Sequence, residues 1–240
     1  GKTTTLRMLA GVLRPTSGDA SVAGVSVVED PEGVKHHIAS LSRRFGLYTD
    51  LTVRATIEFF ADLSRVPRED RPARFERLYA FSGLGPFEDR LAGQLSGGMK
   101  QKLGLCAALI HEPDILLLDE PTFGVDPISR RDLWLIVHEM VARGVTVVVS
   151  TAYLDEAERC DRVMLIHNGA SAMLDTPEAL QNRLQGLVFA VSTDAPRRAR
   201  DVLRTIPEVG QAALFGDVIH VMLRGGPHDL PAARGALAAA

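Results

Sequence analysis

The chain has 240 residues, 46% of them hydrophobic, which is enough for one sizeable core and a small additional unit. Its net charge of −3 gives no electrostatic reason to expect a nucleic-acid partner. No apolar run approaches the roughly 20 residues that span a bilayer, so any membrane role would come through a partner protein.

Turn signals divide the first part of the chain into short elements. Residues 3–12 have helical spacing and stop at a cluster of turn residues. Residues 19–28 alternate as a strand pair around Gly24. Two further helices are predicted over residues 52–65 and 71–82, which are separated by prolines.

The middle of the chain alternates apolar strands with a helix. Residues 115–118 and 145–149 are short apolar runs, typical of parallel strands that are covered on both faces. Between them, residues 129–143 have the spacing of an amphipathic helix that ends at Gly144. This order of strand, helix and strand predicts a crossover in an α/β sheet.

The last third of the chain contains smaller units. Residues 163–167, followed by Asn168-Gly169, predict a hairpin, and Thr176-Pro177-Glu178 predicts the start of a short helix. From about residue 187, the order strand, helix, strand, strand predicts a small second unit, which we expect to be cut off at the end of this sequence.

The first residues match part of a phosphate-binding motif. Gly1-Lys2-Thr3-Thr4 fits the end of G-x-x-x-x-G-K-[ST], and we expect the first glycine of the motif and the strand before it to lie upstream. In such a loop, backbone N–H groups at the helix start face the phosphates. Lys2 would reach the β- and γ-phosphates, Thr3 would occupy one Mg²⁺ position, and Thr4 would offer a further hydroxyl. The alternative is an ordinary helix start capped by threonines.

Two later segments suggest the rest of a nucleotide site. Leu95-Ser96-Gly97-Gly98-Met99 precedes an amphipathic helix and could bind an anion, although such a segment alone fits a flexible loop and a cap. Asp119-Glu120 ends the apolar strand 115–118, where parallel sheets collect ligands. Asp119 would hold Mg²⁺ directly or through water, and Glu120 would accept a proton from the attacking water. The alternative is a turn with two exposed acids.

The ordered set of motifs resembles a known family. G-K-T-T at 1–4, L-S-G-G-M at 95–99, I-L-L-L-D-E-P-T at 115–122 and G-V-D-P at 124–127 resemble the ATP-binding subunit of an ABC transporter. The resemblance covers roughly residues 1–185. Residues 44–53 resemble the Q-loop exit of bacterial ABC-2 type exporters, and residues 151–161 resemble their switch segment.

The resemblance implies an architecture. The α/β fold would be a P-loop NTPase (RecA-like) core of residues 1–45 and 106–185, with a helical subdomain of residues 46–105 inserted between them. Residues 186–240 would form a small α+β C-terminal extension. Two ATP-binding domains would close head to tail, so that Ser96, Gly97, Gly98 and Met99 cover ATP on the partner. Asp126 would lie in the D-loop, between the two sites.

The resemblance also implies a function. ATP and Mg²⁺ would be bound, and ATP hydrolysis would drive export through a separate ABC-2 type permease at the cytoplasmic face of the inner or plasma membrane. The second ATP-binding domain could be an identical chain, a different chain, or the other half of a tandem chain. Two alternatives are a soluble ABC ATPase not tied to transport and a nucleotide sensor that does not hydrolyse ATP.

Three positions depart from the family pattern. Arg43 stands where a glutamine is usual, and its guanidinium cannot ligate a metal but could pair with a γ-phosphate oxygen. A one-residue misalignment or a solvated arginine would also explain it. Ala152 replaces the switch histidine and offers no donor, and Met99 replaces the signature glutamine, a milder loss. We therefore hypothesise an unequal pair of sites, in which this one binds ATP well and hydrolyses it slowly. The competing view is normal turnover through Glu120.

Overall fold

The computed structural model describes residues 1–42, 46–183 and 187–238. The chain divides into two compact units, which are considered separately. The first contains residues 1–156 and 166–170, and the second contains residues 157–165 and 171–240. The division expected from the family resemblance, at residue 185, remains a prediction.

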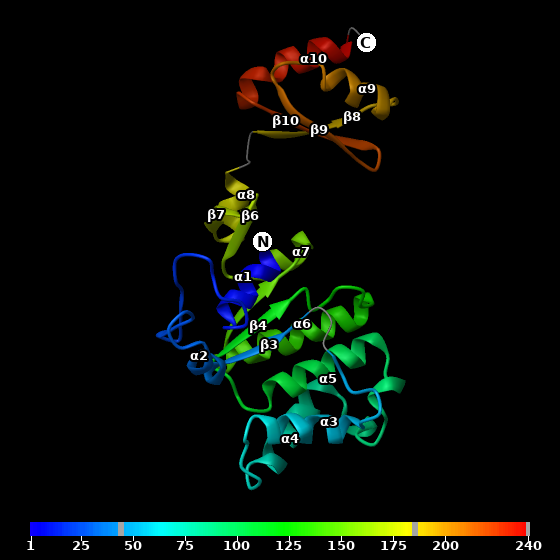
Figure 1. The fold of residues 1–240 in the computed structure, drawn as a ribbon. Coiled ribbons are helices and arrows are strands. Elements are labelled where there is room, and N and C mark those ends of the chain that lie inside the picture. The colour runs from blue at the N-terminus through cyan, green and yellow to red at the C-terminus, as the bar shows by residue number, and fades with distance from the viewer. Residues whose placement is uncertain (43–45, 184–186, 239–240) are drawn as a thin grey trace. The chain divides into compact units, whose positions relative to one another are not determined.

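A three-stranded parallel sheet lies at the centre of the first unit (Figure 1). Its strands run in the order β3 (Ile38–Leu41), β4 (Ile115–Asp119), β5 (Thr146–Ser150). Asp119 pairs in register with Ser150, so the carboxyl ends of β4 and β5 meet at one edge. The predicted strands 115–118 and 145–149 and their parallel crossover are confirmed.

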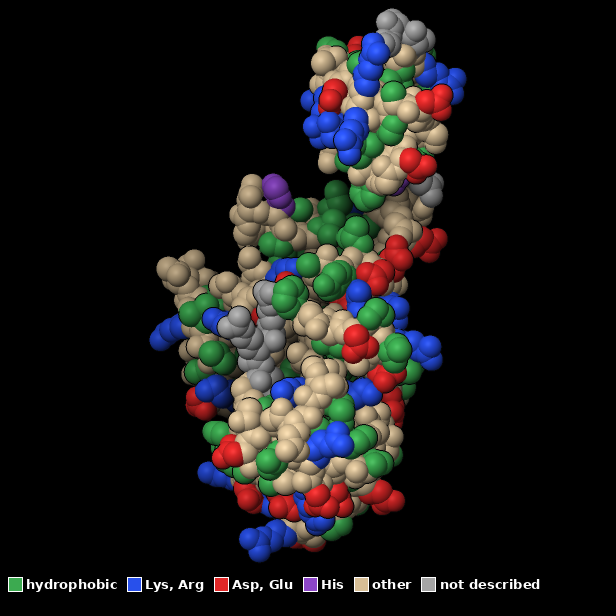
Figure 2. All heavy atoms as spheres, turned by 90° about the vertical axis from the view of Figure 1, so that its right-hand side faces the viewer, with side chains coloured by type: hydrophobic (Ala, Val, Ile, Leu, Met, Phe, Trp, Pro, Cys, Tyr) green, Lys and Arg blue, Asp and Glu red, His purple; other side chains and the backbone are tan. Residues whose placement is uncertain are grey.

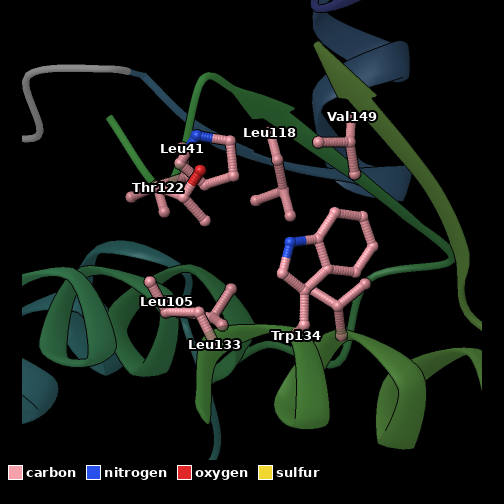
Figure 3. A pocket seen from close by; sticks show the side chains of 9 residues that line it. Leu41, Leu105, Leu118, Thr122, Leu133, Trp134 and Val149 are labelled. Atoms are coloured by element: carbon pink, nitrogen blue, oxygen red, sulfur yellow. The ribbon is translucent and has the colours of Figure 1, made fainter. Parts of the chain in front are cut away.

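Helices cover both faces of this sheet. On one face, α1 (Lys2–Leu9) and α2 (Pro31–His37) surround an apolar cluster made of Leu6, Ala10, Val22, Val27, Val34, Ile38 and Leu117. On the other face, side chains of β3, β4 and β5 meet those of α5 (Gly97–Leu109) and α6 (Pro127–Ala142). Between the sheet and these two helices lies a small cavity of about 10 Å³ (Figure 3). The three layers form the α/β arrangement that the sequence predicts.

The middle strand is buried on both sides. Leu116, Leu117 and Leu118 of β4 are each at most 2% exposed, because consecutive side chains point to opposite, covered faces. Burial of one such leucine side chain contributes about 1.5–3 kcal/mol relative to its exposure to water. This strand therefore gives a rigid support to Asp119, its last residue, and to Glu120, which follows it.

Four further elements of the first unit form a helical segment that packs against α5. They are α3 (Val53–Leu63), α4 (Arg71–Ser82) and the 3-10 turns η1 (Gly85–Phe87) and η2 (Ala92–Gln94). The Thr52 hydroxyl caps α3 by accepting the Ala55 N–H at 3.0 Å. Gly83 ends α4 in the left-handed region, at φ 69°, which glycine adopts at little cost.

The predicted elements of this unit are confirmed with shifts at their ends. The strand pair around Gly24 is β1 (Ser21–Val22) with β2 (Val25–Ser26). The helix predicted at 3–12 already ends at Leu9, because Gly11 takes a positive φ of 64°. The helix predicted at 129–143 begins two residues earlier, because Asp126 caps it and Pro127 occupies its first turn.

The second unit contains an antiparallel sheet with two helices. β8 (Val188–Ser192), β9 (Val209–Phe215) and β10 (Val218–Leu223) pair in the order β8-β10-β9. α9 (Pro196–Leu203), η3 (Gly226–Asp229) and α10 (Leu230–Ala238) complete the fold. Its core contains Ala199, Leu203, Val209, Ala212, Ile219, Val221, Leu223 and Ala233. The predicted order of strand, helix, strand and strand is confirmed.

A hairpin and two short helices complete the chain. β6 (Val163–His167) and β7 (Ala170–Asp175) form the predicted two-stranded sheet, with positive φ at Asn168 and Gly169 of its turn. The short helices are α7 (Leu154–Ala157) and α8 (Pro177–Asn182). On the surface shown in Figure 2, acidic and basic side chains are interspersed rather than separated by sign. No helix within the described residues is long and apolar enough to cross a bilayer.

Candidate functional site

The first two residues of α1 contact groups at the ends of β4 and β5. The Thr3 hydroxyl donates a hydrogen bond to Asp119 Oδ1 at 3.1 Å. The Lys2 ammonium donates to the Thr151 carbonyl at 2.7 Å and lies 3.4 Å from Glu120 Oε1. A lysine, a hydroxyl and two carboxylates from distant parts of the sequence therefore meet at one edge of the sheet.

The orientation of Asp119 is fixed from two sides. Its side chain is buried, at 9% exposure, and Oδ1 also accepts a hydrogen bond of 2.5 Å from the Ser150 hydroxyl. The Glu120 N–H donates to that hydroxyl at 3.1 Å and to the Ser150 carbonyl at 3.0 Å. Because α1 and β5 each bring a hydroxyl group, the Asp119 carboxylate is held in one position.

Glu120 leaves β4 through an uncommon backbone conformation. Its φ is +47°, in the left-handed region, which residues with a Cβ seldom adopt and which costs on the order of 1–3 kcal/mol. The turn brings the carboxylate to 3.4 Å from the Lys2 ammonium, while the side chain keeps 20% exposure. A carboxylate that is held in place and still reached by solvent can act as a general base.

A third carboxylate, that of Glu156 of α7, is fully buried beside these strand ends. Its Oε1 accepts hydrogen bonds of 2.6 Å from the Thr122 hydroxyl and from Arg130 Nε, and its Oε2 accepts one of 2.5 Å from the Thr151 hydroxyl. Burial by itself raises the pKa of Glu156, but the hydrogen bonds from Thr122, Thr151 and Arg130, together with the nearby Trp134 side chain, outweigh it. The pKa is therefore below its ordinary value, and the group is ionised at neutral pH.

Residues 96–99 form the start of α5. The Ser96 hydroxyl caps the helix by accepting the Met99 N–H at 3.3 Å. Ser96 and Gly97 are exposed, so this helix start faces solvent in the single chain. Backbone N–H groups at such a start can bind an anion that approaches from outside.

Gly98 instead packs against the start of α6. A Cβ at this position would come closer than 3.0 Å to the Oγ and Cβ atoms of Ser129, and it would lie 3.7 Å from Asp126 Oδ2. Asp126 caps α6 by accepting the N–H groups of Ile128 at 3.1 Å and Ser129 at 2.9 Å. Hydrogen bonds from the backbone and side chain of Ser129 lower the pKa of Asp126. The segments 96–99 and 126–129 therefore touch within one chain.

Comparison with known proteins assigns the family. A family profile described as ABC transporter matches residues 1–123. The Nod factor export ATP-binding protein I of Burkholderia orbicola is 34% identical over 224 residues, which cover 91% of this chain and 74% of that protein. The chain belongs to the ABC transporter family.

Two further matches agree with this family assignment. The "Probable multidrug ABC transporter ATP-binding protein YbhF" of Escherichia coli is 43% identical over 226 residues, or 93% of this chain. The chain spans about two fifths of that relative, 39% of its length. A solved structure of the ATP binding subunit of an ABC transporter superposes with a TM-score of 0.69 at 27% identity, covering 77% of this chain and 78% of that one. The predicted P-loop NTPase fold class is thereby confirmed.

Four of the site residues predicted from the ABC motifs meet at one place, namely Lys2, Thr3, Asp119 and Glu120. Gly1 caps α1, and its carbonyl accepts the Thr5 N–H at 2.9 Å, while Thr4 is exposed on the first turn. Ala152 follows Thr151 and brings only a methyl group to this edge. Arg43 lies outside the described residues.

Several residues of the site were missed by sequence reasoning. Ser150 and Thr151 could have been found, because they end the apolar strand next to β4 just as Asp119 and Glu120 end β4 itself. Glu156 carries no such signal, since Asp155-Glu156 looks like an exposed acidic helix start. Only the tertiary structure buries one of these two acids and leaves the other in solvent.

Proposed function

We propose that this chain binds ATP with Mg²⁺ at Lys2 and hydrolyses it, and that the energy drives export through a membrane partner. One observation carries the proposal: the Lys2 ammonium lies 3.4 Å from Glu120, and Thr3 is hydrogen-bonded to Asp119 beside it. Lys2 for the phosphates, Thr3 and Asp119 for a metal ion, and Glu120 for the attacking water would therefore all be within reach of a single triphosphate.

Lys2 and the start of α1 would hold the phosphates. In the structure, the ammonium binds the Thr151 carbonyl and lies near the Glu120 carboxylate, and its side chain is 39% exposed. Phosphate oxygens arriving at the N-terminus of α1 would take over part of these contacts. Charge-assisted hydrogen bonds from Lys2 and backbone N–H groups would then bind the β- and γ-phosphates.

Thr3 and Asp119 have the chemistry of a Mg²⁺ site. Hydroxyl and carboxylate oxygens suit this ion, which usually takes one or two protein side chains and completes its shell with water and substrate phosphates. The described part of the chain contains no cluster of three His, Cys, Asp or Glu side chains that could hold a metal, but a site of this kind needs none. Bound Mg²⁺ would neutralise the charge that develops on the transferred phosphoryl group.

Glu120 would act as the general base for the attacking water. Its carboxylate is fixed by the turn after β4 and remains partly exposed, so water can reach it. Such a base contributes about 10²–10⁴ to a rate. Lys2 would draw the phosphate end of the nucleotide toward the same place.

A second ATP-binding domain would complete the site. The exposed start of α5 at Ser96 and Gly97 would cover ATP on that partner, and Asp126 would lie between the two sites. The partner could be a second copy, another chain, or the other half of a longer chain. The relatives include proteins named for multidrug transport and Nod factor export, which supports a permease of the ABC-2 type and a place on the cytoplasmic face of the membrane.

Ala152 favours slow turnover and keeps a nucleotide sensor as the second candidate. A methyl group cannot donate to a γ-phosphate or to water. Replacement by histidine (A152H) should raise the rate of ATP hydrolysis in the assembled transporter without changing the affinity for ATP. An unchanged rate would count against an unequal pair of sites and favour ordinary turnover through Glu120.

The proposal is tested by ATP binding to Lys2→Ala, with Lys35→Ala as the matched control. Lys35 is an exposed lysine of α2 that pairs with Glu32. Removing two charge-assisted hydrogen bonds of about 1.5–3 kcal/mol each should weaken ATP binding by at least about 100-fold in K2A. K35A should bind like the unaltered protein. Equal affinity of K2A and K35A for ATP would contradict the proposal.

A further inference from the structure

Glu156 joins three segments that are separate in the sequence. Its carboxylate accepts hydrogen bonds from Thr122 after β4, from Thr151 after β5 and from Arg130 of α6. The side chain of Trp134 of α6 also contributes to lowering the pKa of Glu156. Thr122 and Trp134 lie on the sheet side and the helix side of the small cavity in Figure 3. A single ionised group therefore connects the ends of two strands to one helix.

The two threonines that bind Glu156 stand next to the groups of the proposed ATP site. Thr122 follows Glu120 by two residues and belongs to the same turn after β4. Thr151 uses its carbonyl to accept from Lys2 at 2.7 Å and its hydroxyl to donate to Glu156. Movement of the Glu156 carboxylate would therefore displace both the turn that bears the base and the carbonyl that contacts the lysine.

The hydroxyl of Thr151 also orders the segment that contains Ala152. It accepts the Tyr153 N–H at 3.0 Å while it donates to Glu156. Arg130 fixes the other end of this segment, with its guanidinium 4.2 Å over the Tyr153 ring and two hydrogen bonds of 3.0 and 2.9 Å to Asp155. Residues 151–156 are thus held at both ends.

We propose that Glu156 is a positioning residue for ATP hydrolysis. It fixes the position of the turn that contains Glu120 relative to the Thr151 carbonyl. The inference depends on the proposed ATPase function and names a residue that acts through others. In a chain with Ala152, the backbone of 151–153 brings no imidazole to the nucleotide. What residues 151–153 contribute to the site is therefore mainly the position of their backbone, which Glu156 sets.

The charge and both oxygens of Glu156 are needed for this arrangement. A glutamine has the same shape, but its amide nitrogen cannot accept a hydrogen bond. One oxygen would remain for the hydroxyls of Thr122 and Thr151 and for Arg130 Nε. At least one of these donors would lose its acceptor, and the two strand ends would no longer be joined.

The test compares Glu156→Gln with Glu139→Gln, the same change in a partly exposed glutamate of α6. Glu139 pairs with Arg143 from a side chain that is 40% exposed. In the assembled transporter, ATP affinity, bound ATP per chain and the single-turnover rate of bound ATP are measured. We expect E156Q to lower that rate by about 10- to 100-fold, because small displacements of catalytic groups have effects of this size. ATP affinity should change less than about 3-fold, and E139Q should match the unaltered protein.

Each other outcome has a defined meaning. A single-turnover rate of E156Q equal to that of E139Q would overturn the proposal, as would a loss of bound ATP with an unchanged rate per bound ATP. If E156Q does not fold, the proposal is tested with Thr151→Val and Thr151→Ser, because valine removes the hydroxyl that donates to Glu156 and serine keeps it. T151V should be slow and T151S should restore most of the lost rate, whereas equal rates would overturn the proposal. Absence of ATP binding in the unaltered protein would instead refute the proposed function.

Discussion

The start of α5 offers a paired test of how residues 96–99 pack against α6. Gly97 and Gly98 are neighbours in the first turn of the same helix. A Cβ at Gly98 would approach Oγ and Cβ of Ser129 closer than 3.0 Å, whereas a Cβ at Gly97 meets nothing within 4 Å. Alanine at either position therefore has the same effect on helix propensity, but only alanine at position 98 disturbs the packing against α6.

The expected free energies follow from these two terms. An alanine in a helix is more favourable than glycine by about 0.5–1 kcal/mol, and both variants gain this. Overpacking against Ser129 costs G98A alone about 1–3 kcal/mol. We expect G97A to raise the free energy of unfolding slightly. The free energy of unfolding of G98A should be lower than that of G97A by the overpacking cost of about 1–3 kcal/mol.

The assay is urea unfolding followed by tryptophan fluorescence. The chain has one tryptophan, Trp134, which is 4% exposed in the first unit and therefore reports on that unit. Replacing Ser129 by glycine should recover much of the stability lost in G98A, because it removes both atoms that would overlap. Equal stability of G97A and G98A would refute the packing argument.

Three further predictions concern titration, reactivity and the core. The stability contributed by ionised Glu156 is present above its unfolded pKa, about 4.3, and is lost as pH falls through its lower folded pKa. E156Q should therefore show a weaker fall in unfolding free energy between about pH 6 and pH 3, and an unchanged pH profile would contradict this. Burial raises the pKa of the Cys106 thiol to about 12. A thiol reagent at neutral pH should thus label one cysteine per folded chain, Cys160, and labelling of both would disagree. Leu118→Ala, at a side chain 1% exposed, should lower the free energy of unfolding by about 2–5 kcal/mol, and a loss below about 1 kcal/mol would show that the site is not tightly packed.

The sequence predicted most of the sheet and the helices around the site. Continuous apolar runs identified β4 and β5, and the spacing of apolar residues identified α6, although the helix begins at Pro127, two residues before its predicted start. The helix α2 and the strand β3 were missed. The Ile38–Leu41 segment mixes small, polar and apolar residues, and it forms a strand because it pairs with β4.

The sequence predicted those residues of the proposed nucleotide site that belong to short, contiguous motifs. Lys2, Thr3, Asp119 and Glu120 stand in such motifs, and the structure brings them together. The ionised state of Glu156 could not be foreseen, because it arises from burial and from donors 5 to 34 residues away in the sequence. The positive φ of +47° at Glu120 also needs the fold, since β5 supplies the acceptors for its N–H.

The account depends most directly on Glu120 as the base beside a nucleotide held by Lys2. Single-turnover hydrolysis of γ-labelled ATP with Mg²⁺ by the unaltered protein and by Glu120→Gln tests this claim. We predict that E120Q keeps its affinity for ATP and loses about 10²–10⁴ in the hydrolysis rate. Hydrolysis by E120Q at the rate of the unaltered protein would contradict the account.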